Sequence, residues 1–380
     1  MDWKITINLE KLAKFTNALL PFLCVVFLIL GLNVSFYFHF LTVVFLLINV
    51  VNFYYLKIQH RHTLLSNFGI IAQGRYMIES IGPELRQYLY ASDTEERPFS
   101  RVERAEVYRK SLNIDSSSAF GSQLNFDGTE FKLRHSLFPM EKSKIDPFSL
   151  TFGEERGLSQ TYTITKPIMI SAMSYGALSS PAVQALARGA KKAGIPMNTG
   201  EGGYPKYHLK EGCDLIFQMG TAKFGVRHAD GTLNDQKLKE LAALPQIKMI
   251  EIKLSQGAKP GKGGLLPKEK ITKEISELRG VPLGQDVVSP SFHPECTSLK
   301  TLVDFIGHVQ EVSQLPVGIK LCIGREEEFV ALVREMKCRH IFPDYISIDG
   351  AEGGTGAAPK SFMDDVGLPL FQALPLVQNI

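Results

Sequence analysis

The sequence predicts an α/β protein in which a (β/α)8 TIM barrel, incomplete at about six strands, follows a transmembrane helical hairpin. Two apolar stretches near the amino terminus indicate the hairpin. From Pro167 onward, short apolar runs alternate with helical segments, a pattern typical of a parallel sheet. Polar residues follow most of these runs, as expected for a site at the carboxyl ends of barrel strands. The expected layout is a hairpin at 1–62, a charged linker and lead-in at 63–160, and the barrel at 161–380.

Composition excludes several classes of protein. The chain has 380 residues, and 42 Lys plus Arg against 39 Asp plus Glu give a net charge of +3. This balance argues against a nucleic-acid partner. The five cysteines are scattered without CxxC spacing, so neither a disulfide framework nor a metal site is expected.

The hairpin prediction rests on two apolar spans, at about 15–32 and 36–56. Each approaches the roughly 20 residues that cross a bilayer. Basic residues flank the pair on its outer sides: Lys4, Lys11, Lys14, Lys57 and Arg61. By the positive-inside rule both ends, and with them the barrel, lie on the cytoplasmic side of a lipid bilayer. A cleaved signal peptide is the alternative, but no small-residue cleavage site follows the first span.

Apolar runs with turn residues at their ends predict the strands of the barrel. The expected strands are 168–173, 196–199, 214–219, 248–254, 317–322 and 345–348. Helices are expected at 179–193, 299–313 and 326–336. The run 286–290 is short and reads equally well as a loop. Six strands are fewer than a closed barrel needs, so we expect either a fragment or a miscounted strand.

Two glycine-rich loops follow predicted strands. GlyAlaGluGlyGlyThrGlyAlaAla occupies 350–358, and 250–264 carries Lys253, Gln256 and Lys259 into a second loop. Bare backbone amides allow close approach of an anionic or planar ligand, so the two loops predict a shared site. The first loop lacks the GxGxxG register and the GK[ST] ending, which excludes a Rossmann or P-loop assignment. A purely structural turn remains the alternative.

Charged residues near strand ends are the candidate site residues. Lys253 and Lys320 lie within apolar strands, where burial is costly unless the ammonium meets an anion or carbonyl. An outward surface lysine is the alternative. Glu201, between glycines, suits a general acid or a ligand for an imine, or else a turn residue facing water. Arg279 reads locally as a charge at a helix carboxyl terminus.

Four ordered motifs carry a resemblance to a known family. They are SerAlaMetSerTyrGlyAlaLeuSer (171–179), AsnThrGlyGluGlyGly (198–203), GluIleLysLeuSerGlnGlyAlaLysProGly (251–261) and AspGlyAlaGluGlyGlyThrGlyAlaAla (349–358). Over roughly 75–380 the chain resembles the FMN-binding synthase domain of glutamate synthase. It is similar above all to membrane-attached glutamate-synthase-like proteins. The resemblance implies a (β/α)8 barrel that holds FMN.

The resemblance also implies roles for individual residues. Those expected to bind the flavin are Ala172, Met173, Ser174, Gln218, Lys253, Lys320, Asp349, Gly353 and Gly354. Those matching positions that hold 2-oxoglutarate or its imine are Glu201, Gln256, Lys259, Arg279 and Ser289, with Glu201 and Lys259 as catalytic groups. The implied reaction is hydride transfer from reduced flavin to 2-iminoglutarate, formed from 2-oxoglutarate and ammonia, in glutamate biosynthesis.

The sequence departs from the family in ways that predict its partners. It contains no amidotransferase domain, and the family's iron–sulfur cysteines and phosphate-binding strands lie past Ile380. We therefore expect an ammonia source and an electron-donor protein as partners, and no iron–sulfur cluster in this chain. Two alternatives stay open. One is a membrane-linked flavin oxidoreductase of another 2-oxo or 2-hydroxy acid, and the other is an inactive truncated product.

Overall fold

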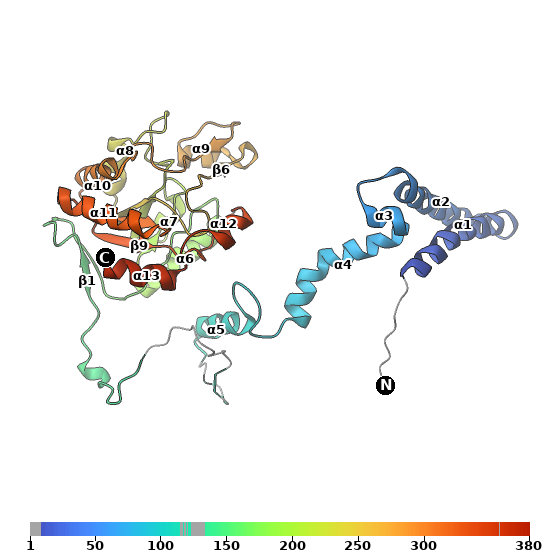
Figure 1. Cartoon of the computed structure of the whole chain (residues 1–380), viewed down its shortest axis with the longest axis horizontal. Helices are drawn as coiled ribbons and strands as arrows, with labels where there is room; N and C mark the ends of the chain where they lie inside the picture. Colours follow the sequence, from blue (N-terminus) through green and yellow to red (C-terminus); the bar gives the residue numbers. More distant parts are fainter. Residues whose placement is uncertain (1–8, 115–116, 118, 120, 123–133, 357) are drawn as a thin grey trace. The chain divides into compact units, whose positions relative to one another are not determined.

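The structure is a computed structural model that describes residues 9–114, 117, 119, 121–122, 134–356 and 358–380. The chain divides into two units, Met1–Ser136 and Leu137–Ile380, each described by itself (Figure 1). Lys4, one of the basic residues used to predict the orientation of the hairpin, lies outside the described residues.

The first unit begins with the two apolar helices that the sequence predicts. Helix α1 (Leu9–Asn33) and helix α2 (Phe38–Phe53) pack together, and a π-helical turn, η1 (Tyr54–Ile58), extends α2. The segments 11–33 and 38–58 are long and apolar enough to cross a membrane. Only 6% of each apolar window is buried, which is unlike the core helix of a soluble domain. Length and composition thus fit the predicted hairpin, and membrane insertion remains a proposal.

A short helical segment packs against the base of these two helices. It comprises α3 (Thr63–Phe68) and the 3-10 turn η2 (Gly69–Ile71). Asn52 is buried there, donates to Asn17 Oδ1 at 2.9 Å and accepts from the Ile70 amide at 2.7 Å. Three helical elements follow, namely α4 (Ala72–Leu85), the π-helical turn η3 (Arg86–Tyr90) and α5 (Arg101–Ser111). Helix α5 has no buried residue, as expected for a charged linker.

The second unit is built on a curled sheet of five parallel strands, in the order β3-β4-β5-β8-β9. These are β3 (Met197–Asn198), β4 (Leu215–Met219), β5 (Ile247–Lys253), β8 (Val317–Leu321) and β9 (Tyr345–Ile348). The helices of this unit are α6 (Ser180–Ala193), α7 (Lys206–Leu209), α8 (Asp235–Ala242), α9 (Lys273–Arg279), α10 (Leu299–Ser313), α11 (Glu326–Arg339), α12 (Lys360–Asp365) and α13 (Leu370–Asn379). Neighbouring strands that follow one another around a parallel sheet fit part of a (β/α)8 barrel.

One strand prediction needs correction, and one open segment is resolved. The segment 168–173 is wrong as a regular strand, because only Ile170 bridges to Met197 and Ile168 is 65% exposed. The described sheet therefore has five parallel strands in place of the predicted six. The run 286–290 contains β7 (Val287–Val288), which pairs antiparallel with β6 (Leu265–Leu266) outside the parallel sheet.

Alternation along the strands separates the two faces of the sheet. In β4, Phe217 and Met219 join the core cluster formed with the covering helices, while Ile216 lies on the opposite face with Met249 of β5. Phe152 packs against this second pair. It belongs to an antiparallel hairpin of β1 (Leu150–Phe152) and β2 (Tyr162–Ile164), which the sequence pattern did not reveal. The hairpin therefore closes the face of the sheet near the starts of its strands.

Candidate functional site

A buried polar network crosses the inner face of the sheet below the strand ends. Glu251 of β5 accepts hydrogen bonds at Oε1 from Asn198 Nδ2 at 2.8 Å and Gln218 Nε2 at 2.7 Å. All three side chains are buried. Buried polar groups need such partners because an unsatisfied one costs about 1–3 kcal/mol. The network thus links β3, β4 and β5 directly beneath the predicted site, and it engages the Gln218 amide in a protein contact.

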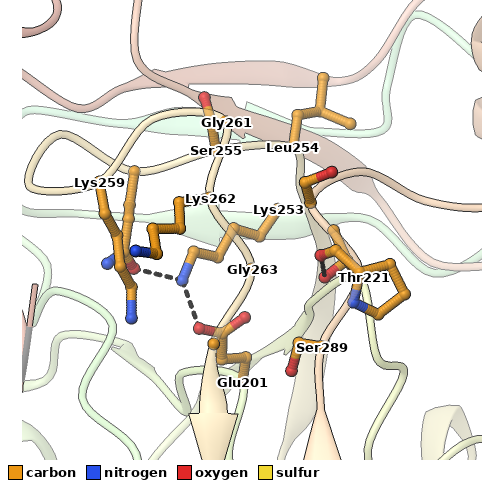
Figure 2. A pocket seen from close by; sticks show the side chains of 14 residues that line it. Glu201, Thr221, Lys253, Leu254, Ser255, Lys259, Gly261, Lys262, Gly263 and Ser289 are labelled. Carbon is orange, nitrogen blue, oxygen red and sulfur yellow. Dashed lines mark hydrogen bonds and ion pairs between the residues drawn. The ribbon is translucent and has the colours of Figure 1, made fainter. Parts of the chain in front are cut away.

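Two lysines lie above this network at paired positions on adjacent strands. Lys253 at the end of β5 is the register partner of Lys320 on β8. The Lys253 ammonium donates to Glu201 Oε1 at 2.6 Å and to Gln256 Oε1 at 2.5 Å (Figure 2). The Lys320 ammonium lies 3.3 Å from Asp349 Oδ2. Both side chains are largely buried and meet carboxylates, so neither is an outward surface lysine.

The electrostatics of Glu201 favour its ionised form. Burial acts to raise the pKa of this carboxyl, but the charges of Lys253, Lys259 and Arg279 outweigh it and lower the pKa below its usual value. The side chain is still 41% exposed, so a ligand in the cleft can reach it. Gly220 passes close behind it, and a Cβ at that position would overlap the Glu201 carboxylate. Glu201 is therefore a carboxylate available to a cationic or N–H ligand group.

The segment between β5 and β8 forms one side of the cleft. It brings Lys259, Lys262 and Ser289 to a small pocket that Glu201 and Lys253 also line. Lys259 and Lys262 lie on the same side of Lys253 in Figure 2. Burial lowers the pKa of Lys259, the Glu201 charge raises it, and the neighbouring Lys253 and Lys262 lower it, with a net decrease. The cleft is thus rich in cations and suits an anionic ligand.

Arg279 reaches the same region from the carboxyl end of α9. Its guanidinium stacks 5.2 Å from the centroid of the Phe224 ring and lies 3.5 Å from the Tyr175 carbonyl oxygen. Its charge acts on Glu201, whose pKa it helps to lower. The local interpretation of Arg279 as a helix-terminal charge is correct for its position, but the fold also directs it toward the cleft.

The two glycine-rich loops lie against one another, as the sequence predicts. The Gly257 amide donates to Asp349 Oδ2 at 3.0 Å, and Gln256 Nε2 donates to Thr355 Oγ1 at 2.9 Å. A Cβ at Gly257 would overlap the Gly350 carbonyl oxygen. In contrast, beyond its two chain neighbours no atom of the described residues lies within 4 Å of a Cβ built at Gly354. Glycine is therefore needed at Gly257 for the loop contact, whereas Gly354 borders open space.

The remaining predicted residues lie around this centre. Ala172, Met173 and Ser174 are half-buried in the segment that follows Ile170. The Met173 carbonyl is 3.0 Å from His208 Nε2. Gly200, with a positive φ of 63°, passes so close to Ser174 that a Cβ would lie 2.7 Å from its amide nitrogen. Backbone contact thus fixes the 172–174 segment beside the turn that carries Glu201.

Sequence reasoning missed three residues of the site: Thr221, Lys262 and Thr355. Thr221 lies just after the end of β4, so its strand-end position was an available signal. Lys262 and Thr355 lie inside the two glycine-rich loops, but nothing local distinguishes them from other loop residues. The assigned roles of the predicted residues stay predictions.

Comparisons with known proteins show which family the chain belongs to. A family model described as the conserved region in glutamate synthase matches residues 116–380. The glutamate synthase large subunit-like protein YerD of Bacillus subtilis is 37% identical over 361 residues, covering 85% of this chain and 68% of that protein. The archaeal-type glutamate synthase (NADPH) of Thermotoga maritima is 42% identical over 216 residues, covering 56% of this chain and 39% of that protein. The chain thus spans well under half of the archaeal-type relative. The extent of these matches shows that the chain belongs to the glutamate synthase family.

Proposed function

We propose that this chain is an FMN-dependent oxidoreductase of the glutamate synthase class, attached to a membrane, that forms glutamate from 2-oxoglutarate and ammonia. The observation that carries the proposal is the pair of register-matched lysines, Lys253 and Lys320, each held by a carboxylate at the mouth of a glycine-lined cleft. Such a site suits an electron-rich ring beside a small anionic acceptor.

The residues present fit FMN as a cofactor. Open space beside Gly354 and the glycine-rich backbone of 350–356 admit a planar ring, and the ammonium of Lys320 offers a donor to its electron-rich edge. The residues that would hold the cofactor are Ala172, Met173, Ser174, Gln218, Lys253, Lys320, Asp349, Gly353 and Gly354. When bound, FMN supplies the hydride. Gln218 would contact the ring from the side of the buried network, because its side-chain amide nitrogen donates to Glu251.

The other side of the cleft would bind the acceptor. Lys259, Arg279 and Ser289 would bind and orient the carboxylates of a 2-oxo acid, with Gln256 positioned by Lys253 and Thr355. Ionised Glu201 would accept a hydrogen bond from the imine nitrogen of the substrate. Lys259, whose pKa is lowered, would give up a proton more readily than an ordinary lysine. Glu201 therefore serves binding and Lys259 proton transfer in this proposal.

The first unit supports attachment to a membrane. Its two apolar helices match the length of bilayer spans, and Lys57, His60 and Arg61 follow the second of them. We place both ends of the hairpin, and the barrel unit with them, on the cytoplasmic side. Electrons and ammonia would come from partner proteins, as the NADPH in the names of the archaeal-type relatives suggests for the electron source.

The test is the visible absorption spectrum of the full chain purified in detergent, before and after addition of FMN. We expect retained flavin, and we expect Lys320→Met to weaken FMN binding about 10- to 100-fold through loss of a charged hydrogen bond. Lys300→Met, at an exposed position on α10, is the matched control. A chain that stays colourless with added FMN refutes the proposal, as does a Lys320→Met variant that binds FMN like the control.

Turnover then identifies the acceptor. Reoxidation of the reduced protein is followed with 2-oxoglutarate plus ammonia and with a panel of other 2-oxo and 2-hydroxy acids. The proposal expects fast reoxidation only with 2-oxoglutarate and ammonia together. Preference for a different acid would keep the flavin assignment and overturn the glutamate assignment.

A further inference from the structure

Glu274, on helix α9, is the centre of a side-chain cluster outside the predicted site. Its Oε1 accepts hydrogen bonds from Lys206 Nζ at 2.6 Å and from Tyr207 OH at 2.7 Å. Its Oε2 accepts from Tyr175 OH at 2.7 Å. The rings of Tyr175 and Tyr207 contact each other at a tilt, with centroids 4.5 Å apart and an interplanar angle of 55°. One carboxylate thus joins α9 to both the 171–179 segment and helix α7.

Helix α9 has a second, backbone-mediated attachment at its carboxyl end. The Tyr204 amide donates to the Leu278 carbonyl at 2.8 Å, and the Gly225 amide donates to the Arg279 carbonyl at 3.4 Å. The approach is close enough that a Cβ at Gly203 would overlap the Leu278 carbonyl. This contact holds the carboxyl end of the helix, apolar packing of Leu278 and Ile275 holds its length, and Glu274 holds its start.

Tyr175 connects the cluster to the cleft. Its hydroxyl is held by Glu274, while its carbonyl oxygen lies 3.5 Å from Arg279 Nη2. The glycine that follows, Gly176, has a φ of 101°, and a Cβ there would lie 2.7 Å from the same Nη2. The Arg279 guanidinium is therefore packed against a turn whose position depends on the Glu274 hydrogen bonds.

We propose that Glu274 is a positioning residue: it fixes α9 and the Tyr175 turn, and thereby holds the Arg279 guanidinium in place at the cleft. The position of Arg279 in turn sets the affinity of the cleft for the carboxylate of a ligand. The inference rests on the proposed function in one respect, that Arg279 binds the acceptor. Glu274 itself touches neither acceptor nor cofactor in this scheme. Its loss would release Arg279 and weaken ligand binding, while the chemistry of a bound ligand would continue.

The electrostatics of the cluster agree with this geometry. Hydrogen bonds from Lys206, Tyr207 and Tyr175 lower the pKa of Glu274 to about 2, so the carboxylate is ionised at any pH suitable for assay. The hydrogen bond to Glu274 in turn raises the pKa of Tyr175 to about 12. The acceptor that holds the two phenols and the ammonium is thus permanently charged under these conditions.

The kinetic test compares Glu274→Gln with Glu277→Gln in the full chain. Glu277 is exposed on the same helix three residues later, and its change to Gln is the matched control. For Glu274→Gln we expect the KM for 2-oxoglutarate to rise about tenfold with kcat changed less than about threefold, since uniform binding would be lost. Unchanged KM relative to Glu277→Gln would overturn the inference. A fall in kcat with unchanged KM would also overturn it, because it would place Glu274 in the chemistry.

A second measurement does not depend on turnover. Hydrogen exchange of the α9 amides is expected to accelerate in Glu274→Gln and in Tyr175→Phe, which keeps the ring contact but loses the hydroxyl, and not in Glu277→Gln. Equal protection in all variants would refute the positioning role. If wild-type protein fails to turn over 2-oxoglutarate while α9 still loosens in the two variants, the proposed function fails and the structural role of Glu274 stands.

Discussion

Removal of the Arg156 guanidinium is expected to destabilise the second unit strongly. Arg156 lies between β1 and β2, and its Nε and Nη2 donate to Asp344 Oδ1 at 3.0 Å and Asp344 Oδ2 at 2.7 Å. Nη2 also donates to the Leu315 carbonyl at 2.9 Å. These bonds attach the β1–β2 hairpin to the residue that precedes β9. Arg156→Met would keep much of the side-chain volume and delete all of them.

The size of the effect follows from what remains around Asp344. Its side chain is 4% exposed, and after the substitution Oδ2 would keep only the 2.6 Å bond from the Val317 amide. Breaking a buried ion pair by removing one partner costs about 3–5 kcal/mol. Arg156 itself is 25% exposed, so water can partly occupy the vacated space. We therefore expect the low end of the range, about 3 kcal/mol.

Arg188→Met is the matched control, because it removes a guanidinium of similar geometry from a solvated position. Arg188 Nε and Nη2 donate to the Glu211 carboxylate at 3.2 and 3.0 Å, but the Arg188 side chain is 71% exposed. Exposed pairs of this kind contribute about 0–1 kcal/mol. The two variants thus separate the contribution of burial from that of bidentate geometry.

The assay is thermal unfolding followed by the near-ultraviolet circular dichroism of tyrosine. Five of the twelve tyrosines of the sequence lie in the second unit, and the change of the signal relative to the Arg188→Met control isolates its unfolding. For a unit of this size, about 3 kcal/mol corresponds to a Tm lowered by about 6–12 °C. If Arg156→Met lowers the Tm no more than Arg188→Met does, the argument that Asp344 is left buried and unpaired is refuted.

Two further predictions concern the loops and the interior of the site. Gly257→Ala is expected to lower the free energy of unfolding, measured by chemical denaturation, by about 1–3 kcal/mol, because the new Cβ would overlap the Gly350 carbonyl. Gly354→Ala is the control, and it should change the free energy of unfolding by less than about 0.5 kcal/mol, because its Cβ would enter open space. Equal effects of the two substitutions would show that the loops separate freely. Burial lowers the pKa of His293 to about 4, from 6.5 in the unfolded chain. Between these two pH values the unfolded chain binds more protons at this imidazole than the folded protein does. The free energy of unfolding should therefore fall by about 3 kcal/mol as the pH is lowered from 6.5 to 4. Nuclear magnetic resonance of the imidazole checks this, and a His293 that titrates near 6.5 would contradict it.

The sequence predicted the elements whose pattern is local. The apolar run 345–348 is β9 residue for residue, and the segments around Lys253 and Lys320 form β5 and β8. The prediction that both lysines point to an anion followed from the cost of burying an unpaired ammonium. The structure brings the two lysines to paired register positions. Local pattern thus sufficed for the centre of the site.

The local sequence pattern could not predict features that depend on contacts between residues distant in the chain. The 168–173 segment has the composition of a buried strand, yet only Ile170 finds a partner. The β1–β2 strands are three residues each, too short to show a period, and they become strands through packing on Ile216 and Met249. Glu274 meets its partner Tyr175 across a separation of 99 residues, which no local rule connects.

The segment that connects β5 to β8 carries residues proposed to bind the acceptor, whereas the residues proposed to bind the flavin ring lie outside it. Strands β5 and β8 pair directly, although the segment between them contains β6, α9 and β7, none of which joins the parallel sheet. Three residues proposed to bind the acceptor carboxylates lie on this segment, namely Lys259, Arg279 and Ser289, whereas Glu201, proposed to bind the imine nitrogen, lies outside it. The groups proposed to hold the ring lie on the strands and loops outside it. A change of acceptor preference can therefore arise within one continuous insertion, by substitutions that leave the sheet and its ring-binding groups untouched.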